Sequence, residues 1–240
     1  MAETGNKIPE DISLKLAIFD FDGTLFPKDT LPFMLSEWKK QYSKIKYFRM
    51  YSSLILLYIK YKILKKRSGG AQQQSREQVK ITAMEKFYKI FSGMTETEVG
   101  EFMRKCAADA AGLLNASVVE EISKARAQGF HTVLLSGAFE NFLKYIGEYL
   151  KMDTVIGTKM NFKDGVFDPG TKPVVVTGEL KLQRIRECFG GETLDWQASR
   201  AYADSFSDAD ILQFVGNPAA VHPDAALKVL ADEKDWEIIA

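Results

Sequence analysis

Short apolar runs alternate with long helical stretches along this chain of 240 residues, and this alternation constrains the fold more than any other feature. Residues 16–19, 131–135 and 200–203 are too short for helices and end at polar residues, which predicts buried strands. Residues 214–216 are a fourth candidate strand, because a turn-forming Asn-Pro pair follows them. Strands that alternate with helices form a parallel sheet with crossover helices, so the sequence predicts an α/β protein.

Three further segments carry local signals. Residues 118–128 and 180–189 are predicted to be helices, since each is followed by glycine. Residues 161–167 contain Asp164-Gly165 between two short alternating runs, which is typical of a hairpin.

A helical block interrupts the strand-helix alternation directly after the first strand. Residues 31–112 contain few turn signals, and Thr95-x-x-Glu98 is a capping box that predicts a helix start. We interpret this block as an insertion that covers the site. The expected division is therefore a core of residues 1–30 and 116–240 with a helical cap of residues 31–115.

Polar side chains follow the predicted strands at the points where they end. Asp20 and Asp22 follow the first strand, Ser136 follows the second and Asp204 follows the third. In open α/β sheets, ligands bind at the carboxyl ends of the strands. We therefore expect these residues to share one site.

Asp20 and Asp22 are the sharpest chemical signal in the chain. Two carboxylates two residues apart beyond a strand point to the same side and can share one site. Because buried neighbouring carboxylates repel each other, a divalent cation near one and a proton on the other would resolve the conflict. Gly23 lets the backbone turn sharply and expose N–H groups to an anion. The alternative is an aspartate-rich turn with only a capping role.

Four motifs occur in the order seen in the haloacid dehalogenase-like phosphohydrolases, and the chain resembles that superfamily over nearly its whole length. The helical insertion resembles the branch with a C1 helical cap, and the Gly-Glu-x-Lys segment resembles its phosphoserine-phosphatase-like subfamily IB. The resemblance implies a Rossmann-like parallel-sheet core with an inserted all-helical C1 cap. The matching segments are Asp20-Phe21-Asp22-Gly23-Thr24-Leu25, Leu134-Leu135-Ser136-Gly137-Ala138, Gly178-Glu179-Leu180-Lys181 and Ala203-Asp204-Ser205-Phe206-Ser207-Asp208.

The resemblance also implies a role for each matching position. Asp20 would be the nucleophile and Asp22 the general acid and base. Mg²⁺ would be held by Asp20, the backbone carbonyl of Asp22 and Asp204. Ser136, Gly137 and Lys181 would bind the phosphate group. Asp208 would support the metal site or orient Lys181.

The implied function is Mg²⁺-dependent hydrolysis of a phosphate monoester, from a small phosphorylated metabolite of unknown identity, through an aspartyl-phosphate. A phosphotransferase or phosphomutase on the same scaffold is one alternative. A lipid-phosphate phosphatase and a catalytically silent module that binds anionic lipid are two others. The sequence leaves the substrate and the oligomeric state open.

The predicted cap is strongly basic within a neutral protein. The whole chain has 32 basic and 32 acidic residues, which gives no indication of a nucleic-acid partner. Residues 38–76, however, contain eleven Lys or Arg and no Asp or Glu. Within this segment an apolar stripe recurs at helical spacing, formed by Tyr47, Tyr51, Leu54, Tyr58 and Tyr61.

Three interpretations of this basic segment stay open. It forms a cap helix packed on its neighbours, or residues 39–67 contact anionic lipid peripherally, or some of its bases face the site and bind an anionic substrate. The apolar run in residues 50–59 is too short to span a bilayer. With no apolar leader in residues 1–11 and two distant cysteines, Cys106 and Cys188, we expect a cytoplasmic protein with reduced thiols, peripheral at the membrane in the second interpretation.

Overall fold

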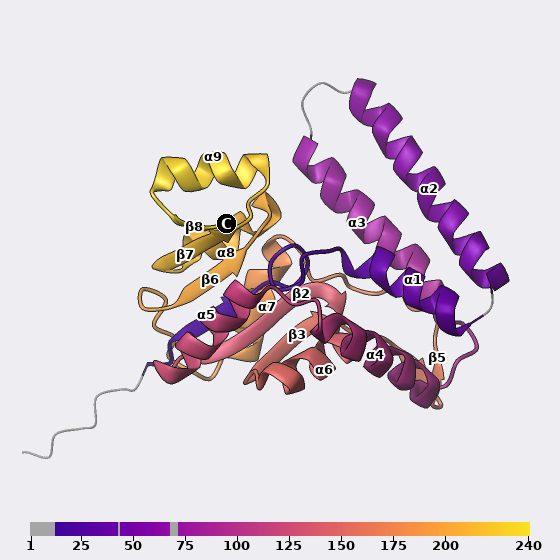
Figure 1. The fold of residues 1–240 in the computed structure, drawn as a ribbon, viewed down its shortest axis with the longest axis horizontal. Helices are drawn as coiled ribbons and strands as arrows, with labels where there is room; N and C mark the ends of the chain where they lie inside the picture. Colours follow the sequence, from indigo (N-terminus) through magenta and orange to yellow (C-terminus); the bar gives the residue numbers. More distant parts are fainter. Residues whose placement is uncertain (1–12, 43, 68–71) are drawn as a thin grey trace, which may run out of the picture.

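The core of the protein is a six-stranded, fully parallel sheet with strand order β3-β2-β1-β6-β7-β8 (Figure 1). The computed structural model describes residues 13–42, 44–67 and 72–240, with the backbone alone at 61–67 and 72–76. The strands are β1 (Leu16–Phe19), β2 (His131–Phe139), β3 (Thr154–Thr158), β6 (Arg200–Ala203), β7 (Asn217–Val221) and β8 (Glu237–Ile239). A separate hairpin pairs β4 (Phe162–Lys163) with β5 (Val166–Phe167), as predicted.

The sheet separates two hydrophobic cores because its side chains alternate between its faces. Ala17 and Phe19 of β1 contribute to one core, whereas Leu16 and Ile18 contribute to the other. The first core is completed by α5 (Ala116–Ala127) and α6 (Glu140–Leu150). The second is completed by α7 (Glu179–Cys188), α8 (Ala209–Phe214) and α9 (Ala225–Lys234). This is the three-layer α/β arrangement predicted from the alternating pattern.

The central position of β1 places the residues that follow it at the middle of the sheet edge. Phe19 is in register with Leu134 of β2 on one side and with Tyr202 of β6 on the other. Beyond the strand, the backbone N–H of Asp20 still donates to the carbonyl of Tyr202 at 3.0 Å. The polar residues that end β1 and β6 are therefore neighbours in space.

Four helices separate β1 from α5, which agrees with the helical content predicted for this block. They are α1 (Thr30–Gln41), α2 (Lys44–Arg67), α3 (Gln72–Tyr88) and α4 (Glu96–Ala111), with a short 3-10 turn at Lys89–Phe91. The predicted capping box is present, because Thr95 accepts from the Glu98 N–H while the Glu98 carboxylate accepts from the Thr95 N–H. Figure 1 shows α2 and α3 side by side and projecting away from the sheet, while α4 packs on α6. That residues 31–115 move as a cap stays a prediction.

The strand predicted at residues 214–216 is wrong. Phe214 is the last residue of α8, and the strand begins at Asn217, in the segment that was interpreted as a turn. Pro218 is tolerated there because β8 pairs with residues 219–221, so its missing N–H interrupts no hydrogen bond to β8.

The second predicted strand is longer than expected. Ser136 and Gly137 lie inside β2, which continues to Phe139, where it pairs with Thr158 of β3 after a shift in register. The Thr158 hydroxyl donates to the Gly137 carbonyl at 2.7 Å and helps to hold this irregular segment. Sequence reasoning stopped the strand at the glycine and did not propose α6, β3, α9 or β8.

The predicted stripe of α2 faces α1, because Tyr47, Tyr51, Leu54 and Tyr58 all line a hollow that they share with residues of α1. Tyr47, Met50 and Leu54 pack against the first core, but Tyr51 and Tyr58 are 45% and 53% exposed. Tyr61, the last residue of the predicted stripe, is among residues 61–67, whose side chains lie outside the described part of the structure.

Cys106 is buried and Cys188 is exposed, and both are free thiols, as predicted. Among the described residues, no helix combines the length and the apolar character that crossing a membrane requires.

Candidate active site

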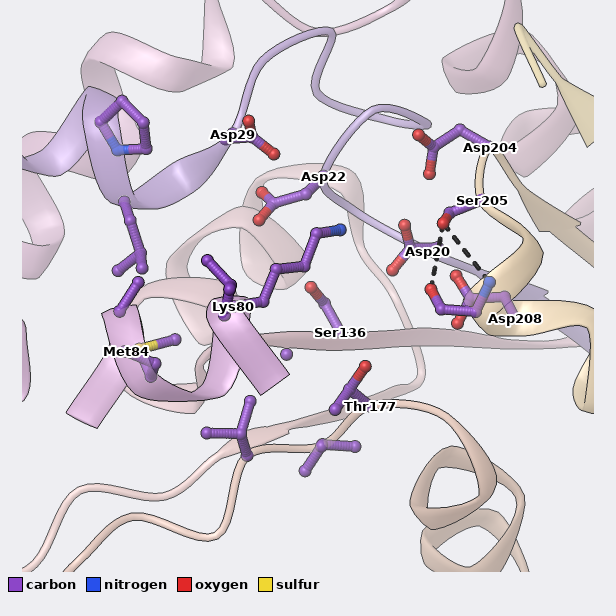
Figure 2. A pocket seen from close by; sticks show the side chains of 18 of the residues that line it. Asp20, Asp22, Asp29, Lys80, Met84, Ser136, Thr177, Asp204, Ser205 and Asp208 are labelled. Carbon is purple, nitrogen blue, oxygen red and sulfur yellow. Dashed lines mark hydrogen bonds between the residues drawn. The ribbon is translucent and has the colours of Figure 1, made fainter. Parts of the chain in front are cut away.

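The seven residues singled out in the sequence line one cavity of about 280 Å³, between the carboxyl edge of the sheet and helices α1–α3 (Figure 2). They come from four distant segments: the end of β1, the middle of β2, the first turn of α7 and the loop after β6. The residues are Asp20, Asp22, Ser136, Gly137, Lys181, Asp204 and Asp208. The structure therefore brings the whole predicted set together.

The loop after β1 turns tightly at Gly23. This glycine has φ +83°, and its N–H donates to the Phe26 carbonyl at 2.8 Å. A Cβ at this position would collide with the Asp204 carboxylate, so glycine is needed both for the turn and for the close approach of Asp204. The turn thus sets the separation between the first and the last acidic motifs.

A triad of acids forms the polar floor of the cavity. Asp20, Asp204 and Asp208 can place one carboxylate oxygen each within 4.8 Å of one another. Lys181, which is 5% exposed, lies between two of them, with its Nζ 2.7 Å from Asp20 Oδ1 and 2.7 Å from Asp208 Oδ1. The lysine thus ties the loop after β1 to the loop after β6.

Burial and the charge of Asp20 disfavour ionisation of Asp204 and Asp208. Burial, reinforced by the charge of Asp20, raises the pKa of Asp204 to about 8. Burial also raises the pKa of Asp208 to about 6, although the Lys181 ammonium opposes that shift. For Lys181, burial favours the neutral form, but Asp20 and Asp208 outweigh it and hold the pKa above its usual range.

Asp22 has a different environment from the triad. Its Oδ1 accepts hydrogen bonds from the Thr30 backbone N–H at 3.1 Å and from the Thr30 hydroxyl, at the start of α1. Burial raises the pKa of Asp22 to about 7, against the opposing effect of Thr30 and with a further rise from Asp20. A carboxyl group of this kind exchanges a proton near neutral pH, which suits acid-base chemistry.

The triad fits a divalent metal. Three carboxylates share one paired ammonium, so the cluster carries excess negative charge in a buried place, and a cation offsets that excess. Hard oxygen donors of this kind favour Mg²⁺ over metals that prefer nitrogen or sulfur ligands.

Ser136 and Gly137 form part of the cavity wall beside the acids. Ser136 is 1% exposed, and its Oγ accepts from the Ala138 N–H at 3.2 Å. Figure 2 shows its hydroxyl pointing into the space between Lys80 and Asp20.

Lys80 is the main site residue that sequence reasoning missed. It lies on α3, and Figure 2 shows its side chain extending toward Asp20 and Asp22 across the cavity. Its positive charge lowers the pKa of Asp22, Asp204 and Asp208. No motif surrounds it, and it lies just beyond the basic segment of residues 38–76, so only the packing of α3 places it here.

Asp224 supports the loop after β6 from behind. Its backbone N–H donates to the Asp204 carbonyl at 2.7 Å, and its Oδ2 accepts from the Ser205 hydroxyl at 3.3 Å. Its other carboxylate oxygen caps α9, so one side chain links the helix start to the acidic loop.

The fold and the site define a class of protein: a parallel α/β core whose acidic site lies under helices that follow the first strand. The characteristic sequence of the haloacid dehalogenase-like hydrolases matches residues 17–213. The chain belongs to this family, which confirms the resemblance seen in the motifs.

Curated relatives match about half of the chain or less. The inhibition of morphological differentiation protein of Streptomyces azureus is 35% identical over 124 residues, which are 52% of this chain and 44% of that protein. A phosphoserine phosphatase of Mycobacterium tuberculosis is 33% identical over 93 residues, 39% of this chain and 30% of that protein. A histidinol-phosphatase of Neisseria meningitidis is 29% identical over 115 residues, 46% of this chain and 52% of that protein.

Solved structures share the fold over almost the entire chain. A protein of unknown function from Bordetella pertussis superposes with a TM-score of 0.74 at 19% identity, covering 95% of this chain and 99% of that one. A phospho-aspartyl intermediate analogue of phosphoserine phosphatase gives a TM-score of 0.55 at 16% identity, covering 95% and 93%.

Proposed function

We propose that this protein hydrolyses a phosphate monoester with the help of Mg²⁺, through a phosphate group carried transiently by Asp20. The observation that carries the proposal is the arrangement of Asp20, paired with Lys181, within a carboxylate triad that faces a cavity and lies beside the weakly acidic Asp22. The names of the phosphatase relatives support the same reaction class.

In the first step, an oxygen of the Asp20 carboxylate attacks phosphorus and forms a P–O bond. The bond between phosphorus and the ester oxygen breaks, and Asp22 donates its proton to the departing alkoxide. Burial keeps part of Asp22 protonated near neutral pH, which provides this proton.

In the second step, the ionised Asp22 takes a proton from a water molecule that attacks the same phosphorus. The bond to Asp20 breaks, and inorganic phosphate leaves. Asp22 ends the cycle protonated and Asp20 ionised, so both groups return to their starting states.

Mg²⁺ would be held by Asp20, by the Asp22 backbone carbonyl and by Asp204, with Asp208 supporting the site or orienting Lys181. When bound, the metal offsets the repulsion between an anionic nucleophile and an anionic phosphate. Lys181, the Ser136 hydroxyl and the Gly137 N–H would hold the phosphate oxygens, where fixed charges and donors provide most of the rate enhancement.

Residues 31–115 would act as the cap. The cap would open to admit substrate and close to exclude bulk water. In the closed arrangement Lys80 would add a positive charge to the wall of the cavity that α3 forms.

The test is phosphate release from p-nitrophenyl phosphate by the native chain and by Asp20→Asn, each with Mg²⁺ and with EDTA. We expect Asp20→Asn and EDTA each to reduce turnover to background. The matched control is Asp164→Asn, in the exposed hairpin turn, which should retain native turnover. Native turnover by Asp20→Asn contradicts the proposal, and transfer of phosphate to an added alcohol without phosphate release identifies a phosphotransferase instead.

A further inference from the structure

The wall of the cavity opposite the acids is made of hydrocarbon. It is formed by α1, α2 and α3, and the side chains that carry the argument are Leu31, Pro32, Leu54, Leu57, Val79 and Met84. Figure 2 shows Met84 and its unlabelled apolar neighbours on the side of the cavity away from the aspartates. The cavity is thus polar at one end and apolar at the other.

Charged lining residues of the described cap segment are confined to the polar end. Asp29 lies near Asp22 at the start of α1, and Lys80 extends toward the aspartates (Figure 2). Farther along the wall, Tyr58 adds a large ring that carries a hydroxyl group. A substrate with charged groups distant from its phosphate would lose their hydration against this wall, which is costly without partners.

The apolar wall continues out of the cavity. A second hollow lies between α1 and α2 and shares Pro32, Leu54 and Tyr58 with the cavity. It extends to Tyr51 and Ile55, which are 45% and 40% exposed on the outer side of α2. Pro32, Leu54 and Tyr58 thus border both the cavity and the outer hollow, so a row of apolar side chains, called here the apolar path, extends from the acidic site to the surface.

We propose that the alcohol part of the substrate carries a single hydrocarbon chain that lies against this path, with its phosphate at Asp20. This inference rests on the proposed function and adds the class of substrate to it. A chain in the path exchanges water for the side chains of Leu54, Leu57 and Met84, and each buried methylene strengthens binding by about fourfold. The chemistry of the two ends of the cavity defines this ligand: its phosphate lies at the acids and its hydrocarbon chain lies between α1 and α2.

The test is a series of n-alkyl phosphates from butyl to octyl, assayed with Mg²⁺ at concentrations at which they stay monomeric. The value of kcat/KM should rise about fourfold per methylene, or about 200-fold across the series. O-phosphoserine should be a poorer substrate than octyl phosphate. A flat series, or a preference for O-phosphoserine, overturns the inference.

Two neighbouring leucines on α2 provide a matched pair of variants. Leu57→Asn changes the apolar wall, whereas Leu56→Asn changes a side chain that is 66% exposed and does not line the cavity. The octyl-to-butyl ratio should fall about tenfold in Leu57→Asn, mainly through KM for octyl phosphate, and should stay native in Leu56→Asn. Equal ratios in the two variants contradict a chain that contacts Leu57.

Binding of the matching n-alkylphosphonates, which have no ester bond to cleave, separates this inference from the proposed function. Calorimetry with the native chain and Mg²⁺ should show the same dependence on chain length. If phosphonate binding becomes tighter with chain length but no phosphate ester is hydrolysed, the proposed phosphatase function is overturned and the inferred ligand class is retained. Hydrolysis of p-nitrophenyl phosphate with no dependence on chain length retains the function and overturns the ligand class.

Discussion

Removal of the buried ammonium at Lys181 should destabilise the metal-free protein severely. The Nζ atom lies 2.7 Å from both Asp20 and Asp208, and the three side chains are 6%, 10% and 3% exposed. Loss of one partner from a buried ion pair costs about 3–5 kcal/mol, because the remaining charge is left uncompensated. Since small proteins have a total stability of about 5–15 kcal/mol, Lys181→Met should remove a large fraction of it.

The assay is urea unfolding at pH 7 with EDTA, which isolates the ion pairs from any bound metal. The pKa of Lys181 is raised in the folded state, so at pH 7, below the ordinary lysine pKa of about 10, the lysine's contribution is fully present, and it is lost as the pH rises through the folded pKa. The control is Arg184→Met on the same helix, whose ion pair with Glu187 is exposed and should matter far less.

Two further measurements make the reasoning refutable. Asp208→Asn in the Lys181→Met background should recover part of the lost stability, because it removes one of the stranded carboxylates. Addition of Mg²⁺ should reduce the cost of Lys181→Met, since a cation compensates the same charges. A loss below about 1 kcal/mol for Lys181→Met in EDTA would show that the buried pair does not carry the charge balance of the site.

Three other predictions concern the fold and its link to the site. Asp153→Asn should lower the urea midpoint at pH 7, and the difference should shrink as the pH falls below the ordinary aspartate pKa of about 4. Burial raises the pKa of Asp153, but the hydrogen bonds from Thr132 outweigh burial and leave the pKa lowered, so the stabilisation is lost as the pH falls through the folded pKa. A midpoint difference that is independent of pH would contradict this. Thr95→Ala should cost about 1 kcal/mol in thermal or urea unfolding because it removes the capping box of α4, and an unchanged midpoint argues against that role. Gly23→Ala should reduce the rate of phosphate release even under conditions in which urea unfolding shows the variant to be folded, since the added methyl group displaces Asp204. Native turnover would show that the close approach of Asp204 to Gly23 is dispensable.

The sequence was sufficient to predict three of the six strands, β1, β2 and β6, and the polar residues at their ends, because these depend on local patterns. Short apolar runs define β1 and β6, and Asp20 and Asp204 follow them directly. Parallel register then brings the strand ends together without further information. Lys181 came from the family resemblance, because a lysine in the first turn of a helix has no distinctive local pattern.

The parts that sequence reasoning missed depend on long-range packing. Lys80 lines the site only because α3 packs over the cavity, and no local signal encodes that placement. The start of β7 was interpreted as a turn because it contains the Asn217-Pro218 pair. A proline is excluded from a strand only where a neighbouring strand needs its N–H, and that depends on the strand pairing, which the local sequence does not show. Periodicity placed the apolar stripe of α2 on one face, but it did not show that Tyr51 and Tyr58 stay about half exposed, because that depends on how closely α1 packs against this face.

Lys80 lies on α3 and not on the sheet, so the net charge of the active site depends on where α3 lies. With α3 in place, two ammonium groups face the four carboxylates of Asp20, Asp22, Asp204 and Asp208; with α3 displaced, one does. An uncovered site therefore attracts cations more strongly, and a covered site tolerates an incoming anion better. Movement of one helix would thereby favour loading of the metal first and retention of the phosphate ester second.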